Sequence, residues 1–429
     1  MPNEPTRSSR FPQSAWDSRL SALFGLVLLV RLLYPFFNSP LTHLFSDPLR
    51  HWNNGARFLA PDLIGAGDPY VYQLWLYLVR TLSADAPAWV QLSCGVLCAA
   101  MPYGWYRALR ELLPRNQALV GALLIAMVPS FLGIYAYFMN ETLLLTLTGF
   151  AFWLTLHTWR TGSLAAWTLC CTVWTLAVFT RVVALPMAAA CLPLLWLLQR
   201  QRLERMLIGT VIVGILAVVA GLHAKAVLGY FEPLGNGYIT EIYNLSGKHD
   251  ITLNGGAEGS YNFGSPSFYN PTFYPFSDWA TDRRGVVAIR IDVRQGRDTW
   301  IAALTQATAG SPMSRGARLR ENLWFLLFGQ SWPDNDRTTL VGWASVWCRW
   351  LWPALMLYVA AGTVLRRYRG HEWLLPLCAL GMLVFFALQS TAIMEGRYRK
   401  PVDPILLAAA IVLYCRTRLA PAGAAYSRP

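Results

Sequence analysis

A short cationic segment near the C-terminal end of the chain is the first candidate for chemistry. Within residues 395–401, Arg397, Arg399 and Lys400 stand beside Glu395 and Tyr398. Short loops between membrane spans normally place Lys and Arg on the cytoplasmic side. The alternation of spans in this chain places the segment on the opposite side, so we expect its cations to bind an anionic ligand. We also expect Glu395 and Tyr398 to contact the substrate.

Two carboxylates and one further arginine are expected at the same membrane depth. Asp47 follows the first apolar run, and Glu141, next to Asn140, begins the fourth. Arg181 stands alone between the fifth and sixth runs. Ionisable groups near the bilayer are costly, and functional roles are their default explanation. Two carboxylates and a group of cations at one depth can form a reaction site.

Each of these residues also has a purely structural explanation. Asp47 can cap a helix that begins at Pro48, a contribution of about 1 kcal/mol. Glu141 can complement the positive end of its own helix, and Arg181 can reach lipid headgroups or end a tight turn. The cations of residues 397–400 can bind bulk anionic lipid. Their agreement on one face of the membrane favours a shared site.

The elements that must position these residues are membrane helices. The 429 residues are 55% hydrophobic and 14% charged. A bilayer core of about 30 Å needs about 20 apolar helical residues. Ten runs meet or approach this length, at roughly 19–37, 87–106, 117–135, 141–159, 164–180, 182–199, 206–228, 343–364, 372–391 and 402–415. We therefore predict an all-α polytopic membrane protein whose first run, lacking a cleavage site, is retained as a span.

Positive charge sorts the loops between the runs by side. Basic residues recur after every second run, at 7–19, 107–115, 160, 200–205, 366–369 and 416–418. The positive-inside rule then places both termini inside. The segments expected outside are 38–86, 136–140, the turn at Arg181, 229–342 and 392–401.

The chain is expected to divide into three parts. Residues 1–228 form an N-terminal membrane core, with two short interfacial helices near 48–59 and 69–82 in its first outer loop, 38–86. Residues 229–342 form a large outer segment. It opens as a loop with room for a hairpin, and a helical stretch around 282–308 and an amphipathic segment at 320–329 follow. Residues 343–429 supply the C-terminal membrane helices.

Several function classes find no support in the sequence. The net charge of +13 lies largely in short loops and tails, so we expect membrane lipids rather than nucleic acid as partners. All eight cysteines fall in or beside the runs without CxxC spacing, which favours neither a disulfide framework nor a metal site. Phosphate-binding Walker A loops, HExxH and GxSxG motifs are absent from the sequence, and we expect no cofactor.

Three places in the sequence carry a resemblance to a known family. An acid, Asp47, follows the first span in a loop with two interfacial helices; an aromatic stretch, 137–141, ends in an acid at the start of a span; and Gly-Arg-Tyr-Arg-x-Pro-x-x-Pro at 396–404 precedes the last span. Together they resemble the GT-C superfamily of membrane glycosyltransferases, including the dolichyl- and undecaprenyl-phosphate-sugar transferases. Two adjacent acids often occur in the first loop of that family. Here Asp47 stands between Ser46 and Pro48, which leaves the subfamily and any metal requirement open.

The resemblance implies transfer of a sugar from a polyprenyl-phosphate donor to an acceptor hydroxyl, with inversion. That chemistry requires a base for the hydroxyl proton and cations for the departing phosphate. Asp47 is the expected base, and Glu141 is its main rival. The expected phosphate ligands are Arg397, Arg399, Lys400 and Arg181, and the secondary substrate contacts are Asp68, His51, Tyr398, Asn140 and Glu395.

Two other classes remain open on the sequence alone. A transporter of lipid-linked saccharide would normally show repeat symmetry and helices broken at the midplane. A membrane ligase or acyltransferase is the other alternative. The acceptor can be a lipid, a glycan or a secreted protein. Arginine bias and compact loops favour a bacterial inner membrane, with the site facing the periplasm.

Overall fold

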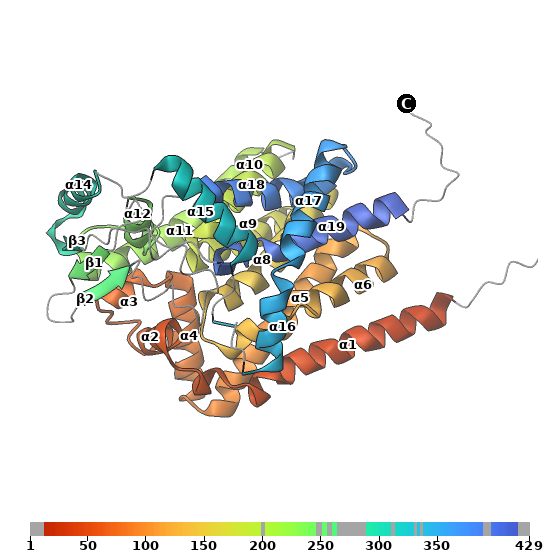
Figure 1. The fold of residues 1–429 in the computed structure, drawn as a ribbon, viewed down its shortest axis with the longest axis horizontal. Helices are drawn as coiled ribbons and strands as arrows, with labels where there is room; N and C mark the ends of the chain where they lie inside the picture. The colour runs from red at the N-terminus through yellow and green to blue at the C-terminus, as the bar shows by residue number, and fades with distance from the viewer. Residues whose placement is uncertain are drawn as a thin grey trace, which may run out of the picture.

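Helices make up most of the structure, as expected for an α-helical membrane protein (Figure 1). The computed structural model describes residues 13–198, 202–245, 251–254, 260–263, 289–309, 314–329, 333–334, 338–388 and 396–418. Every apolar run of the sequence coincides with one helix or with two consecutive ones. The helices on these runs are α1 (Gln13–Phe37), α5 (Pro87–Leu112), α6 (Arg115–Ala126), α7 (Pro129–Gly133), α8 (Asn140–Thr161), α9 (Leu164–Thr180), α10 (Leu185–Leu198), α11 (Arg202–Leu228), α16 (Leu340–Cys348), α17 (Leu351–Val364), α18 (Leu374–Leu388) and α19 (Asp403–Arg418).

The predicted number of ten spans is not confirmed. Within the described residues, three helical stretches are long and apolar enough to cross a membrane: Asp17–Thr42, Arg202–Leu228 and Gly370–Leu388. A fourth is obtained if Arg115–Ala126 and Pro129–Ala136, which meet at a 71° bend, count as one span. Several remaining helices are shorter than the 18 residues of a straight crossing, among them α9, α10, α17 and α19.

A buried arginine in α1 satisfies carbonyl groups at a proline in α5 and at the bend between α6 and α7. Arg31 is 1% exposed and donates to the carbonyl oxygens of Cys98 at 2.8 Å, Ala126 at 2.8 Å and Phe131 at 2.6 Å. Pro102 of α5 has no N–H to offer to Cys98, and Ala126 and Phe131 flank the bend. Because an unsatisfied carbonyl in the bilayer costs several kcal/mol, Arg31 makes the proline and the bend tolerable.

Glycines set the closest helix contacts in the core. A Cβ atom on Gly104 of α5 would lie 3.0 Å from the backbone nitrogen of Phe150 in α8, and Gly149 faces Trp105 equally closely. A Cβ atom on Gly95 would clash with the carbonyl oxygen of Leu32 in α1. Small residues allow such backbone approach in membrane helix pairs. The close packing of α1, α5 and α8 fixes where Glu141, in the first turn of α8, can lie.

Within residues 38–86, the chain folds into three short helices against the core. They are α2 (Ser46–Ala56), α3 (Leu63–Gly67) and α4 (Tyr70–Ser83). Trp52 of α2 stacks on Phe138, just before α8, with ring centroids 4.5 Å apart. Gly55 lets α2 approach α4, because a Cβ atom there would lie 2.7 Å from the Cβ of Leu76. Helices occupy both predicted positions, and the aromatic stacking brings Asp47 towards the start of α8.

The long segment between α11 and α16 carries a small sheet at one end of the molecule (Figure 1). Strand β1 (Ile251–Asn254) pairs antiparallel with β2 (Ser260–Phe263) and parallel with β3 (Ile289–Ile291). Helices α12 (Gly237–Leu245), α14 (Arg297–Ala307) and α15 (Arg315–Phe328) belong to the same segment. Tyr238 and Trp300 pack there with Leu228 at the end of α11. The sheet is a departure from a purely α-helical chain and agrees with the hairpin for which the sequence left room.

Candidate active site

Arg397 joins the two candidate carboxylates, although they lie far apart in the sequence. Its Nη1 donates to Oδ2 of Asp47 at 2.9 Å, and its Nε lies 4.0 Å from Oε1 of Glu141. Asp47 lies in the first turn of α2, Glu141 in the first turn of α8, and Arg397 in the short 3-10 helix Gly396–Arg399. The three elements meet at one end of the helical core.

Arg181 completes this group from the C-terminal end of α9. It forms an ion pair with Oε1 of Glu141. The guanidinium groups of Arg181 and Arg397 both approach the ring of Tyr398, at 5.1 Å and 5.9 Å from its centroid. A ring between two guanidinium groups orients them by cation–π attraction. We call Asp47, Glu141, Arg181 and Arg397 the bridged cluster.

The two carboxylates of the bridged cluster differ in environment. The side chain of Glu141 is 1% exposed, whereas that of Asp47 is 11% exposed. Oε2 of Glu141 has no hydrogen-bond partner within the described residues. A buried carboxylate oxygen left without a donor costs free energy. This oxygen is therefore available to a substrate hydroxyl.

Asp47 is held ionised by two arginines. Arg50 donates to its Oδ1 at 2.7 Å, and Arg397 to its Oδ2. Burial alone would raise the pKa of Asp47, but the charges of Arg50 and Arg397 outweigh burial and hold the pKa well below its usual range. The preceding residue, Ser46, has a φ of 44°, a conformation uncommon outside glycine. This strained entry sets the direction in which α2 presents Asp47.

Asp68 and His51 form a buried network that shares Arg50 with Asp47. Asp68 accepts from Arg50 at 3.1 Å, Asn54 at 2.7 Å and Gln73 at 3.3 Å, and it lies 3.2 Å from Nδ1 of His51. Burial opposes ionisation of Asp68, but Arg50 and His51 lower its pKa overall. The network connects α2 to α4. Through Arg50 it supports Asp47, and Oε1 of Gln73 within it has no hydrogen-bond partner among the described residues.

The other two cations of the predicted phosphate site have protein partners. Arg399 is 2% exposed; it donates to Asp403 at 2.9 Å and to the carbonyl oxygen of Leu327 at 3.2 Å. Lys400, 1% exposed, forms an ion pair with Asp334. We call Asp334, Arg399, Lys400 and Asp403 the buried ion-pair cluster. The four expected phosphate ligands therefore divide, with Arg181 and Arg397 in one group and Arg399 and Lys400 in the other.

The remaining expected contacts lie in different places. Asn140 is half-buried at the first position of α8, and its Oδ1 has no hydrogen-bond partner within the described residues. Glu395 lies outside the described residues. Across the part of the chain that the structure describes, no group of three or more His, Cys, Asp or Glu is arranged to hold a metal ion.

Sequence reasoning missed the residues that support the site. Asp334 and Asp403 neutralise Lys400 and Arg399, and Gln73 and Asn54 complete the Asp68 network. Asp403 stands in the Gly-Arg-Tyr-Arg string and four residues after Arg399, a spacing that pairs side chains on a helix. Asp334 carries no comparable local signal.

Part of the chain matches a known family. Residues 68–223 match the model of the dolichyl-phosphate-mannose-protein mannosyltransferase family, a family of the GT-C superfamily. No curated protein matches the chain. The matched segment contains Glu141 and Arg181 but ends before Arg397 and begins after Asp47. The match confirms the resemblance to the GT-C superfamily and implies a membrane glycosyltransferase of this type.

Proposed function

We propose that this GT-C-type protein transfers a sugar from a polyprenyl-phosphate donor to an acceptor hydroxyl, with inversion at the anomeric carbon. The observation that carries the proposal is the position of Arg397, which reaches both Asp47 and Glu141 while Arg181 pairs with Glu141. Two guanidinium groups and two carboxylates at one point supply both charge types that this reaction needs.

Arg397 and Arg181 bind the donor phosphate. Guanidinium groups form paired hydrogen bonds with phosphate oxygens, and preorganised cations are most valuable where negative charge develops. Both groups lie against the ring of Tyr398, which limits their motion. Arg399 and Lys400 contribute by holding this segment in place, because their charges are neutralised by Asp403 and Asp334.

Asp47 takes the proton of the acceptor. The hydroxyl oxygen bonds to the anomeric carbon as the bond from that carbon to the phosphate oxygen breaks. The proton goes to Asp47, and the bonding electrons leave with the polyprenyl phosphate. Asp47 is the better exposed of the two carboxylates. A phosphate that draws Arg397 towards itself also weakens its hold on Asp47, which makes this carboxylate a stronger base as the donor binds.

Glu141 orients hydroxyl groups of the sugar or acceptor through its unpartnered Oε2. It remains the rival for the base. Asn140, its neighbour at the start of α8, offers a second unpartnered oxygen for the same purpose. Two such acceptors in the first turn of α8 suit a polyhydroxyl substrate.

The proposed setting is a bacterial inner membrane with ten spans, both termini inside and the site facing the periplasm. The coincidence of all ten apolar runs with helices supports it. In this arrangement the membrane core of residues 1–228 and the helices of residues 343–429 build the site, and the outer segment 229–342 covers the same side. The acceptor is a lipid, a glycan or a secreted protein.

The full-length protein in detergent, given a donor labelled in its sugar, tests the proposal. Release of free polyprenyl phosphate is expected for the enzyme and not for a transporter. Loss of release in Asp47→Asn and Asp47→Ala, with a smaller loss in Glu141→Gln, assigns the base to Asp47. Undiminished release in all three variants would overturn the carboxylate mechanism, and absence of release from every polyprenyl-phosphate sugar would overturn the proposed function.

A further inference from the structure

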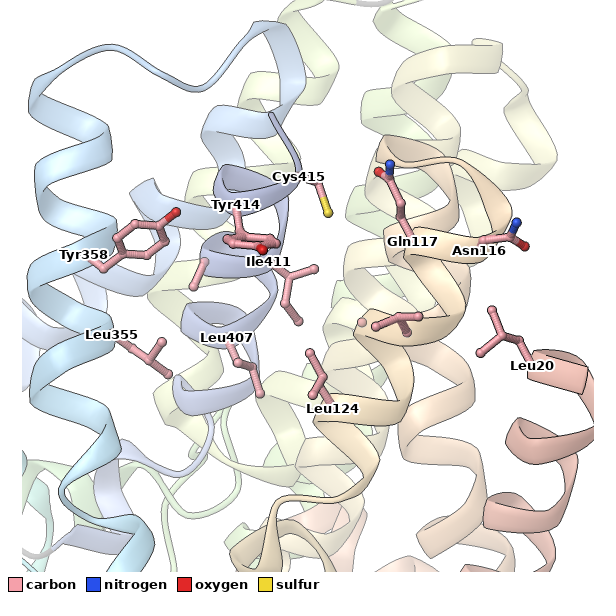
Figure 2. A pocket seen from close by; sticks show the side chains of 13 residues that line it. Leu20, Asn116, Gln117, Leu124, Leu355, Tyr358, Leu407, Ile411, Tyr414 and Cys415 are labelled. Atoms are coloured by element: carbon pink, nitrogen blue, oxygen red, sulfur yellow. The ribbon is translucent and has the colours of Figure 1, made fainter. Parts of the chain in front are cut away.

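An apolar cavity of about 430 Å³ lies between α6, α17 and α19, with Leu20 of α1 also in its lining (Figure 2). Leu407, Ile411 and Tyr414 line it from one side of α19, at the three- and four-residue spacing of a helix face. Asp403, at the other end of α19, belongs to the buried ion-pair cluster. Tyr414 lies about 16 Å further along the helix, at 1.5 Å per residue. None of the residues that line the cavity belongs to the bridged cluster.

The lining of the cavity is almost entirely apolar, and most of the residues in it that carry polar groups lie towards one end. Asn116, Gln117 and Tyr414 gather towards the ends of their helices, while Leu124 and Leu407 lie deeper (Figure 2). A cavity with this polarity fits an amphipathic molecule whose head lies at the polar end. Its hydrocarbon part would contact the leucines.

Positive charge surrounds the polar end. Arg115 precedes Asn116 at the start of α6, Arg416 follows Tyr414 in α19, and Arg366 and Arg367 follow the end of α17. All four side chains are exposed. Arg416 is paired with Glu372, and Arg115 donates to the hydroxyl of Ser21 at 3.0 Å. Arginines at or just beyond the ends of α6, α17 and α19 thus lie at one end of the cavity, which favours an anionic head.

We propose that this cavity binds an acidic phospholipid, with one acyl chain between α6 and α19 and its headgroup at Arg115, Arg366 and Arg367. In a membrane, lipid acyl chains fill an apolar cavity between helices. Basic residues near the helix ends select lipids with anionic headgroups. A polyprenyl donor bound at Arg397 does not fit as well. Its apolar tail, rather than a headgroup, would meet the polar end.

Filling the cavity tests the acyl-chain part of the proposal. Val120 lines the cavity, whereas Val213 of α11 lies outside it, and each is 43% exposed. Native mass spectrometry of the full-length protein, titrated with phosphatidylglycerol, is expected to show one tightly bound lipid in the wild type and in Val213→Phe. In Val120→Phe its affinity is expected to fall about tenfold, the equivalent of displacing two methylene groups.

A second pair of variants keeps the test decisive if Val120→Phe misfolds. Leu124, which lines the cavity, and Leu222 of α11 are 52% and 56% exposed. Leu124→Trp is expected to lose the lipid and Leu222→Trp to keep it, with unchanged melting temperatures. Equal loss in the matched controls would overturn the cavity assignment. Displacement of the lipid by polyprenyl phosphate would also overturn it. The same holds if the protein forms a dimer that is lost in Val120→Phe.

The headgroup part is tested separately. Phosphatidylcholine with the same acyl chains is expected to bind the wild type more weakly than phosphatidylglycerol. The double variant Arg115→Gln, Arg367→Gln is expected to bind the two lipids equally, because the cavity still holds an acyl chain but no longer selects the headgroup. Equal binding of both lipids by the wild type would overturn the anionic selectivity.

Discussion

The bridged cluster and the buried ion-pair cluster both take cations from the same short segment, 397–400. They differ in how fully carboxylates of the protein neutralise these cations. The side chain of Arg397 is 12% exposed. It lies 2.9 Å from a carboxylate oxygen of Asp47 and 4.0 Å from one of Glu141. Arg399 and Lys400 each have one close carboxylate and almost no exposure. Successive side chains of one short segment thus enter two environments with opposite properties.

The difference shows that charge type alone does not mark a ligand site. A buried ion pair whose donors are already used fixes structure, because taking one partner away leaves an uncompensated charge. A partly exposed arginine between two carboxylates can exchange a partner for an incoming anion. Burial and the number of partners therefore distinguish Arg397 from Arg399, and the following changes test that distinction.

Breaking the Arg399–Asp403 pair is expected to give the largest effect, on stability. Arg399→Met leaves Asp403 buried without its partner and should lower the free energy of unfolding by about 3–5 kcal/mol. Unfolding in a detergent titration measures this. The double variant Arg399→Met, Asp403→Leu removes both charges and should recover most of the loss. Failure of the double variant to recover would show that Arg399 acts through more than its carboxylate partner.

Removing Arg397 is expected to act on catalysis instead. Arg397→Ala should lower kcat for polyprenyl-phosphate release by about 10²- to 10³-fold, the cost of losing one preorganised donor to a developing anion. Arg397→Lys should recover part of it, since a point charge remains without the planar pair of donors. The contrast with Arg399 collapses if Arg397→Ala alters only unfolding, or if folded Arg399→Met loses as much kcat.

The sequence predicted part of this arrangement but not the contrast. The positions of the helices followed from apolar runs, because period and length are local properties. The juxtaposition of Asp47, Glu141 and Arg397 followed from loop parity, which places them on one side. Loop parity predicts the side of the membrane on which a residue lies, but not the direction in which its side chain points. It grouped Arg399 and Lys400 with Arg397, and only the fold shows that they point to Asp403 and Asp334.

The number of spans and the supporting residues could not be predicted for a related reason. Arg31 lies inside an apolar run that was correctly taken as a helix, but its three carbonyl partners come from the turn before Pro102 in α5 and from the bend between α6 and α7. Prolines and bends in membrane helices are stable only when other residues satisfy the freed backbone groups. Such compensation is a property of tertiary contacts, so run length alone does not fix the number of straight crossings.

Arg181 provides an intermediate case within the bridged cluster. Arg181→Gln removes one phosphate ligand and also the partner of Glu141. A hydrogen bond to a charged group is worth about 1.5–3 kcal/mol, so kcat/KM should fall about ten- to hundredfold, less than for Arg397→Ala. Kinetics with a donor concentration series measures it. If Arg181→Gln exceeds Arg397→Ala in effect, the principal phosphate ligand is Arg181 and the order of the two arginines must be reversed.

The smallest expected effect concerns proton binding at Asp47. Its folded pKa lies below the ordinary value of 3.8, because burial is outweighed by Arg50 and Arg397. The carboxylate pairing therefore stabilises the folded protein above that value and is lost as pH falls through the depressed folded pKa.

Arg50→Gln removes one of the two charges without touching the proposed phosphate ligands. The pKa of Asp47 should rise, so the acid limb of the kcat/KM profile should move to higher pH. Arg57→Gln, near the end of α2 and 65% exposed, serves as the control and should leave the profile unchanged. An unchanged acid limb in Arg50→Gln would show that the base titrating in the free enzyme is not Asp47, and Glu141 would then take its place in the mechanism.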